Sequence, residues 1–257
     1  MGLKLINIIL PMYNEELSFH SLQQMFKGEM LLPVEYDYRI IIVNDGSTDR
    51  TLEYALKWRA ENPRINVISH DNNHGLGQAI LTGFREAIKF QSYCVVTMDA
   101  DASHPVGTIN DLVSAISLGA DIAIASRYTT GGKQIGVSPI RTLYSTGARC
   151  LLSMVFPLKG VRDYTVNFRA YRTNLIQEGL SRANEPFLVF DTFTAAAEIL
   201  LKMAPLADKI VEVPLVLHYD WKESSSKLKV GATIRDYLKL CLLPKKKGTI
   251  GRGLNII

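Results

Sequence analysis

The chain contains an apolar run that ends in two acidic residues, Tyr93-Cys94-Val95-Val96-Thr97-Met98-Asp99-Ala100-Asp101. The run is typical of a buried strand, in which side chains at positions i and i+2 point the same way. Asp99 and Asp101 therefore share a face, where two anions repel each other unless a positive charge neutralises them. A hard divalent cation shared with a diphosphate does this, so the pattern indicates a site for a metal-chelated nucleotide. A solvated loop explains the two acids alone equally well.

Apolar segments alternate with helical patterns through the first half of the chain. The predicted strands are Leu5–Leu10, Tyr38–Val43, Ile65–Ser69, Tyr93–Met98 and Asp121–Ser126. Between them lie the predicted helices, Glu16–Phe26, Arg50–Glu61, Gln78–Phe90 and Pro105–Leu118. Strands without polar alternation, separated by helices, predict an α/β fold with a Rossmann-like, mostly parallel sheet flanked by helices.

Candidate ligand-binding residues follow every predicted strand. In order along the chain they are Pro11, Tyr13 and Glu15, then Asp45, then Gly75 and Gly77, then Asp99 and Asp101, and finally Arg127. Ligands of parallel sheets bind beyond the carboxyl ends of the strands, so these residues are expected to meet at one edge. Singly, each has an ordinary explanation: a helix-capping loop, a bare turn, a tight glycine turn or a surface salt bridge. Arg127, directly after the fifth strand, is predicted to be an unpaired cation or to form that salt bridge. Their coincidence at one edge is stronger evidence than any single motif.

The second half is less regular and contains one informative helix, which opens at Ser138-Pro139. Its small and apolar residues form an i, i+3, i+4 stripe of Ile140, Leu143, Tyr144, Gly147, Ala148, Leu151, Leu152 and Val155. Arg141, Ser145 and Arg149 lie on the other face, which can grip a phosphate or simply be solvated. A loop at 129–133, a polar loop at 163–172, a helix at 193–202, a strand at 209–219 and a last helix at 230–243 complete the prediction.

Composition limits the class of protein. The chain has 257 residues, 47% of them hydrophobic and 21% charged, and a net charge of +4. Residues 1–125 are acidic and residues 126–257 are basic, which suits a cation in the first half and phosphates or an anionic membrane surface in the second. No dense basic run with interleaved aromatic residues indicates nucleic-acid binding.

The cysteines and apolar runs indicate the compartment. Cys94, Cys150 and Cys241 are widely spaced and odd in number, which fits a reducing environment and opposes a disulfide scaffold. The apolar start at 1–10 is predicted to be a strand and not a signal peptide. No apolar run approaches the ~20 residues that span a bilayer.

Together these residues resemble family 2 glycosyltransferases of the GT-A fold, and among them the dolichol-phosphate and polyprenyl-phosphate mannosyltransferases. The likeness runs from about residue 5 to 229. Its motifs are Pro11-Met12-Tyr13-Asn14-Glu15, Asn44-Asp45-Gly46-Ser47-Thr48-Asp49, Asn73-His74-Gly75-Leu76-Gly77, Met98-Asp99-Ala100-Asp101-Ala102-Ser103-His104-Pro105, Ser126-Arg127-Tyr128 and Ser224-Ser225-Ser226-Lys227-Leu228. The block from Asp99 to Pro105 is the most specific.

The resemblance implies a role for each candidate residue. Donor binding falls to Pro11, Tyr13, Glu15 and Asp45 at the nucleoside, with Gly75, Gly77, Lys222 and Lys227 also on the donor side. Asp99 and Asp101, with Ser103, are implied to hold Mg²⁺ or Mn²⁺ against the diphosphate. Arg127, Arg141 and Ser145 fall where the family grips the acceptor phosphate. Two departures concern the donor: Asn44 stands where Asp is common, and Trp221-Lys222 replaces a common arginine.

The expected activity is inverting transfer of a sugar, preferably mannose from GDP-mannose, to a polyprenyl or dolichyl phosphate. Residues 1–229 are expected to form the catalytic domain, and residues 230–257 a C-terminal helix and basic tail at the membrane interface. A peripheral position on the cytoplasmic face of a membrane follows from these expectations.

The sequence is also compatible with three alternative functions. A family 2 enzyme that uses a UDP-sugar and a hydroxyl acceptor would need a general base, for which Asp163 or Asp191 is available. A nucleotidyltransferase would need a basic signature near the N-terminus, which residues 5–14 lack. A non-catalytic nucleotide-sugar-binding protein would retain the acidic pair.

Overall fold

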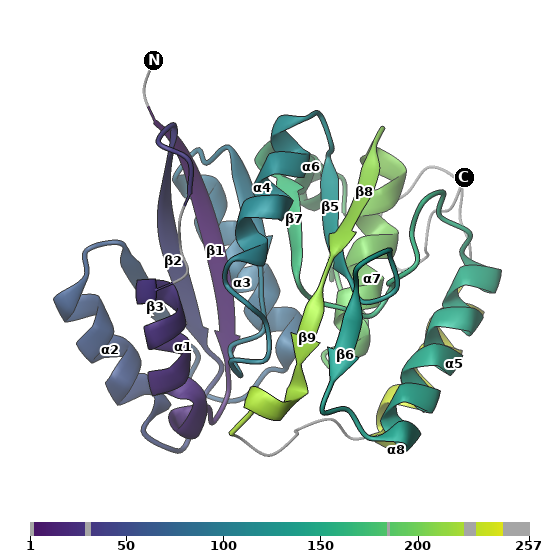
Figure 1. The fold of residues 1–257 in the computed structure, drawn as a ribbon, viewed down its shortest axis with the longest axis horizontal. Coiled ribbons are helices and arrows are strands. Elements are labelled where there is room, and N and C mark those ends of the chain that lie inside the picture. Colours follow the sequence, from purple (N-terminus) through teal and green to yellow (C-terminus); the bar gives the residue numbers. More distant parts are fainter. Residues whose placement is uncertain (1–2, 29–31, 184–185, 224–229, 244–257) are drawn as a thin grey trace.

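The computed structural model describes residues 3–28, 32–183, 186–223 and 230–243. Its centre is a seven-stranded sheet in the order β3-β2-β1-β4-β7-β5-β8 (Figure 1). The strands are β1 (Lys4–Met12), β2 (Tyr36–Asn44), β3 (Ile65–Ser69), β4 (Cys94–Thr97), β5 (Ile122–Ser126), β7 (Arg169–Arg172) and β8 (Ile210–Pro214). The five strands predicted in the first half all form, and the mostly parallel sheet is confirmed.

One strand runs against the others. β7 pairs antiparallel with both β4 and β5, and it separates them. The sequence predicted only a polar loop that leads into a strand or turn here, because Arg169 and Arg172 hide the apolar pattern of a central strand. Arg169 is nevertheless 1% exposed, and its guanidinium donates hydrogen bonds to the carbonyl oxygens of Tyr164 and Ala196.

Helices cover both faces of the sheet. They are α1 (Glu16–Gly28), α2 (Thr51–Glu61), α3 (Leu76–Lys89), α4 (Thr108–Ser117), α6 (Thr173–Arg182) and α7 (Thr194–Met203). α3 packs on β1 and β2 and also contacts α6 and α7, whereas α4 lies on the other face over β5 and β7 (Figure 1). α6 was not predicted, and α4 begins three residues later than expected because Pro105 and Val106 lie in the preceding turn.

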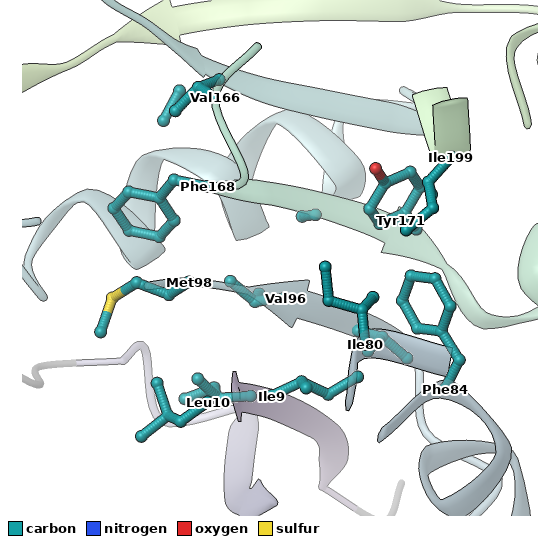
Figure 2. Packing of buried hydrophobic residues seen from close by; sticks show 14 of the residues in the cluster. Ile9, Leu10, Ile80, Phe84, Val96, Met98, Val166, Phe168, Tyr171 and Ile199 are labelled. Atoms are coloured by element: carbon teal, nitrogen blue, oxygen red, sulfur yellow. The ribbon is translucent and has the colours of Figure 1, made fainter. Parts of the chain in front are cut away.

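The core fills the space between the central strands and α3. Figure 2 shows Ile80 and Phe84 of α3 beside Val96, with Phe168 and Tyr171 of the β7 region above them. The rings of Phe84 and Tyr171 meet edge to face, with centroids 5.6 Å apart. This continuous apolar core holds the carboxyl ends of β1, β2 and β4 at one edge.

A smaller unit extends that edge. β6 (Lys133–Ile135) pairs in parallel with β9 (Val216–His218). The predicted strand at 209–219 is therefore wrong as one element, because the chain leaves the main sheet at Leu215 and joins a second sheet. A short helix, η2 (Tyr219–Trp221), follows β9, and a second short helix, η1 (Ala204–Leu206), follows α7.

Two helices flank the small sheet: α5 (Pro139–Val155) and α8 (Val230–Leu242). They pack against each other (Figure 1). Gly136 has a φ of +74°, and a Cβ there would come within 2.6 Å of the backbone nitrogen of Asp220. The chain that leads into α5 thus lies directly against η2. Among the described residues, no helix combines the length and the apolar character needed to cross a bilayer.

Candidate active site

The two acids of the opening motif lie together in a cavity beyond the end of β4. The Asp99 carboxylate accepts a hydrogen bond of 3.0 Å from the Asn167 side chain. Oδ1 of Asp101 accepts bonds from the hydroxyl of Ser103, at 2.6 Å, and from its backbone nitrogen, at 3.1 Å. Asp99, Asp101, Ser103 and Asn167 all line the same cavity. The structure therefore brings together the three residues assigned to a metal.

The second oxygen of Asp101 contacts a lysine from the other end of the chain. Nζ of Lys222 lies 2.5 Å from Oδ2 of Asp101, and both side chains are largely buried. Burial alone would raise the pKa of Asp101, but the ammonium charge outweighs burial and holds that pKa below its usual value. Burial alone would lower the pKa of Lys222, but the charge and hydrogen bond of Asp101, with the charge of Glu15, raise that pKa above its usual value. Both groups are ionised at neutral pH.

These oxygen atoms suit a hard divalent cation. Carboxylate and hydroxyl oxygens are the ligands that Mg²⁺ and Mn²⁺ prefer. No cluster of three or more His, Cys, Asp or Glu residues is placed to hold a metal in the described parts of the chain. Mg²⁺ in nucleotide sites is commonly held by one or two carboxylates together with substrate phosphates. The donor set thus fits a metal shared with a diphosphate better than a metal bound by protein alone.

Basic and apolar residues line the same cavity as the acids. Arg127, Arg141 and Ser145 line its polar part with Lys222. Its apolar walls include Leu217 of the small sheet, Tyr144 and Ala148 of α5, Ala196 of α7, and Ile234 and Tyr237 of α8, with Val137 and Phe193 from the residues just before α5 and α7. One cavity therefore offers charged groups and a hydrocarbon-like surface side by side.

Arg127 is not the unpaired cation that its position after β5 suggested. Its Nε and Nη2 each donate a 2.7 Å hydrogen bond to the Asp163 carboxylate, and Nη2 also donates to Thr165. Burial alone would raise the pKa of Asp163, but the charge and hydrogen bonds of Arg127 hold it below its usual value. The prediction of an unpaired cation is corrected, because the buried carboxylate neutralises most of its charge.

Arg141 and Ser145 lie one turn apart on α5 and face the cavity. A guanidinium nitrogen of Arg141 donates to the hydroxyl of Tyr219, and the guanidinium carbon lies 4.8 Å from the centre of that ring. The hydroxyls of Ser145 and Tyr128 are 2.8 Å apart. Arg149, the third residue of this face, lies over the ring of Tyr128 and is absent from the cavity lining.

The candidate nucleoside residues lie at the ends of β1 and β2. Pro11 is paired with Val43 inside the sheet, and Tyr13 is half-buried in the loop that follows. Glu15 is 7% exposed, and its backbone nitrogen donates to the hydroxyl of Thr51. The charge of Glu15 also helps to raise the pKa of Lys222.

Both carboxylate oxygens of Asp45 have hydrogen-bonding partners within the protein. Its Oδ1 lies 2.7 Å from Nδ1 of His70 and accepts from the backbone of His74, while Oδ2 accepts from the backbone of Gly75. Nε2 of His70 in turn lies 2.9 Å from the hydroxyl of Thr82. Asp45 thus fixes the turn after β3, and its assignment to the nucleoside stays a prediction. Nothing in the sequence near His70 indicated this role.

Gly75 and Gly77 lie close against the segment that leads into α7. Gly75 has a φ of +87°, and a Cβ there would collide with the carbonyl oxygen of Asp191. A Cβ on Gly77, in the first turn of α3, would come within 2.8 Å of Leu188, Ala195 and the carbonyl oxygen of Phe190. These glycines let the loop before α7 pack against α3. Their implied place on the donor side stays a prediction.

Several cavity residues were missed by sequence reasoning. They are Asn167, Thr165, Tyr219 and Tyr237, whereas His104 of the motif that ends at Pro105 also lines the cavity. His104 is 3% exposed and stacks on Phe168, with ring centroids 5.0 Å apart. The others come from a loop, a short helix and α8, and no local pattern marks them. Lys227 lies outside the described residues.

The comparisons with known proteins agree with this geometry. Residues 7–180 match the family model described as glycosyl transferase family 2. A dolichol-phosphate mannosyltransferase from Pyrococcus furiosus is 34% identical over 249 residues, which are 96% of this chain and 66% of the relative. A polyprenol monophosphomannose synthase from Mycolicibacterium smegmatis is 34% identical over 54% of this chain and 52% of its own length. The chain therefore spans between half and two thirds of these relatives.

A solved structure shows the same fold. The glucosyl-3-phosphoglycerate synthase of Mycobacterium tuberculosis, solved with Mn²⁺, uridine diphosphate and glucosyl-3-phosphoglycerate, superposes with a TM-score of 0.66 at 20% identity. The superposition covers 93% of this chain and 78% of that one. It supports the GT-A fold that the motifs implied. The family match covers more than half of the chain, and the chain belongs to glycosyl transferase family 2.

Proposed function

We propose that this protein transfers a sugar from a nucleoside diphosphate sugar to the phosphate of a polyprenyl or dolichyl phosphate, with inversion at the anomeric carbon. Mannose from GDP-mannose is the preferred donor, because two relatives named for mannose transfer match this chain over 249 and 180 residues. The observation that carries the proposal is the single cavity in which paired acids, cations and apolar walls meet.

The acidic end of the cavity would receive the donor. Asp99 and Asp101, with Ser103, would hold Mg²⁺ or Mn²⁺ against the diphosphate. When bound, the metal supplies Lewis-acid stabilisation of the negative charge on the leaving nucleoside diphosphate. Asn167 orients Asp99, and Lys222 stands close enough to Asp101 to contact a diphosphate oxygen there.

The basic end would receive the acceptor. A phosphate monoester is already an anion, so it needs orientation and relief from repulsion by the donor, and it needs no general base. Arg141 and Ser145 would hold its oxygens, and Arg127 would contribute through the nitrogen that Asp163 does not occupy. One acceptor oxygen forms the bond to the anomeric carbon as the bond to the diphosphate oxygen breaks.

The apolar walls and surfaces suit the lipid. α5 exposes Ile140, Leu143, Tyr144 and Met154, and α8 exposes Ile234, Leu238 and Leu242. An amphipathic helix with such a face lies in the headgroup region of a bilayer. We therefore place these two helices at a membrane surface, with the protein peripheral on the cytoplasmic side. We also propose that residues 1–229 form the catalytic domain and residues 230–257 the part at the membrane interface. α8, in the second part, packs against α5 and α7 and lines the cavity.

The geometry gives less support to a hydroxyl acceptor. Asp163 is held as a carboxylate by Arg127, and a low pKa makes it a poor general base. Asp191, the other candidate, does not line the cavity. A non-catalytic sugar-nucleotide sensor differs by turnover: it would bind donor without consuming it.

A donor panel tests the proposal. Radiolabelled GDP-mannose, UDP-glucose and UDP-N-acetylglucosamine are each incubated with one polyprenyl phosphate, with and without a chelator. We expect chelator-sensitive label in the lipid fraction from one donor, and its loss in the Asp99→Ala, Asp101→Ala double variant. Asp111→Ala, an exposed change on α4, is the matched control. Undiminished transfer by the double variant would refute the proposed site.

A further inference from the structure

Lys222 contacts Asp101, a carboxylate that the proposed function assigns to a metal. Its ammonium lies 2.5 Å from Oδ2 of Asp101, while Oδ1 is taken by Ser103. The side chains of Lys222 and Asp101 are only 11% and 13% exposed, so water screens their attraction weakly. The Asp101 carboxylate thus has a positively charged partner that the protein itself supplies.

We infer that Lys222 is the resident counter-ion of Asp101 and that it must leave this carboxylate before a divalent cation can bind there. The inference rests on the proposed function, because it takes Asp101 to be a metal ligand. A divalent cation that enters beside the ammonium meets a like charge at close range, which weakens its binding.

The donor provides the ammonium with another partner. A diphosphate bound beside Asp101 brings anionic oxygens into the same end of the cavity, and a lysine has a flexible four-carbon stem that can reach them. The backbone of Lys222 is anchored, because its nitrogen donates to the carbonyl oxygen of Tyr219 at 3.3 Å. Tyr219 is itself held by Arg141 on α5.

This exchange links metal and nucleotide binding. Without a nucleotide, Lys222 competes with the metal for Asp101. With a nucleoside diphosphate, the ammonium transfers to the phosphates and the competition ends. Each ligand then favours the other by the same factor, as linkage requires. The protein would bind metal weakly alone and tightly as the metal–nucleotide pair.

Direct Mn²⁺ binding tests the inference without an activity assay. Free Mn²⁺ is measured by electron paramagnetic resonance during titration of the full chain, with and without guanosine diphosphate or uridine diphosphate. A protein-free titration corrects for Mn²⁺ bound by the nucleotide in solution. Lys222→Met is compared with the wild type and with Lys89→Met, which removes an exposed lysine paired with Glu86 on α3.

We expect Lys222→Met to bind Mn²⁺ about tenfold more tightly than the wild type when no nucleotide is present, within the usual range of coupling between sites. The factor by which the diphosphate tightens Mn²⁺ binding should fall by a similar amount. Lys89→Met should match the wild type in both respects. Lys222→Gln serves as a second neutral variant if the methionine variant does not fold, and Lys222→Arg should retain the weak wild-type binding.

The outcomes separate the two claims. If Lys222→Met and the wild type bind Mn²⁺ equally without nucleotide, the counter-ion role is wrong and the proposed metal site stands. If the wild type binds no Mn²⁺ even with either diphosphate, both claims fail. If Asp101→Asn binds Mn²⁺ as well as the wild type does, Asp101 is not the shared ligand and the inference is overturned.

Discussion

Arg127 and Asp163 form a two-pronged ion pair beneath the candidate acceptor site. Two bonds of 2.7 Å join the guanidinium to the carboxylate, and the Asp163 side chain is completely buried. Arg127 begins the segment after β5, and Asp163 begins the loop that leads to β7. The pair therefore fixes one wall of the cavity as well as orienting a cation toward it.

Removal of the Asp163 charge should destabilise the fold. Asp163→Asn leaves the buried Arg127 without its counter-ion, and breaking such a pair costs about 3–5 kcal/mol. Urea denaturation at pH 7 measures the free energy of unfolding. Asp208→Asn, on an exposed residue, is the control and should change little. A loss as small as the control's would show that the pair contributes nothing to stability.

The loss of stability caused by Asp163→Asn should depend on pH. The folded pKa of Asp163 is depressed, so its contribution to stability is present above the unfolded pKa of ~3.9 and disappears as the pH falls through the folded pKa. The difference in unfolding free energy between wild type and Asp163→Asn should therefore shrink below about pH 4. A difference in unfolding free energy that stays constant down to pH 2 would contradict the lowered pKa of Asp163.

Gly77 should matter for packing more than for donor binding. A Cβ there would press on Leu188 and Ala195, and overpacking of this kind costs about 1–3 kcal/mol. Gly147 is the matched control, because a Cβ there meets nothing and replacement of glycine by alanine in a helix gains about 0.5–1 kcal/mol. If Gly77→Ala keeps its stability and loses donor affinity, Gly77 acts on the donor side and the packing role is wrong.

Arg141 should be needed for the acceptor. Arg141→Ala removes a charged donor from the cavity, and we expect transfer to polyprenyl phosphate to fall by a factor of about 10²–10³. Arg149→Ala removes the same charge from the same helix outside the cavity lining and should stay close to wild type. Steady-state rates and donor affinity are measured for both. Equal losses in the two variants would indicate a general effect of charge on α5.

The native cysteines report on the surface of α5. Cys150 is exposed, whereas Cys94 is buried and burial raises its pKa to about 12. A water-soluble maleimide should therefore label Cys150 quickly and leave Cys94 unmodified while the protein is folded. On vesicles that contain anionic lipid, Cys150 labelling should slow, because it lies on the same side of α5 as Met154. A cysteine introduced at Asp111 on α4 should label equally with and without vesicles, and unchanged labelling of Cys150 would count against the membrane-facing assignment.

The sequence by itself determined the main sheet, most of its helices and the edge at which the acids meet. These follow from local pattern: apolar strands, helical periodicity and polar residues at strand ends, all of which act over a few residues. The pattern failed at β7, where two arginines masked a central strand, and at 209–219, where one apolar run serves two sheets.

Only the tertiary structure decided how the charges pair. Lys222 reaches Asp101 across 121 positions of sequence, and Asp163 reaches Arg127 across 36. Local pattern carries no information about which distant side chains share a buried space, because that depends on how the core closes and on which charges burial forces into contact. Folding thus converted the predicted unpaired Arg127 into half of a buried pair and placed a lysine on the predicted metal ligand.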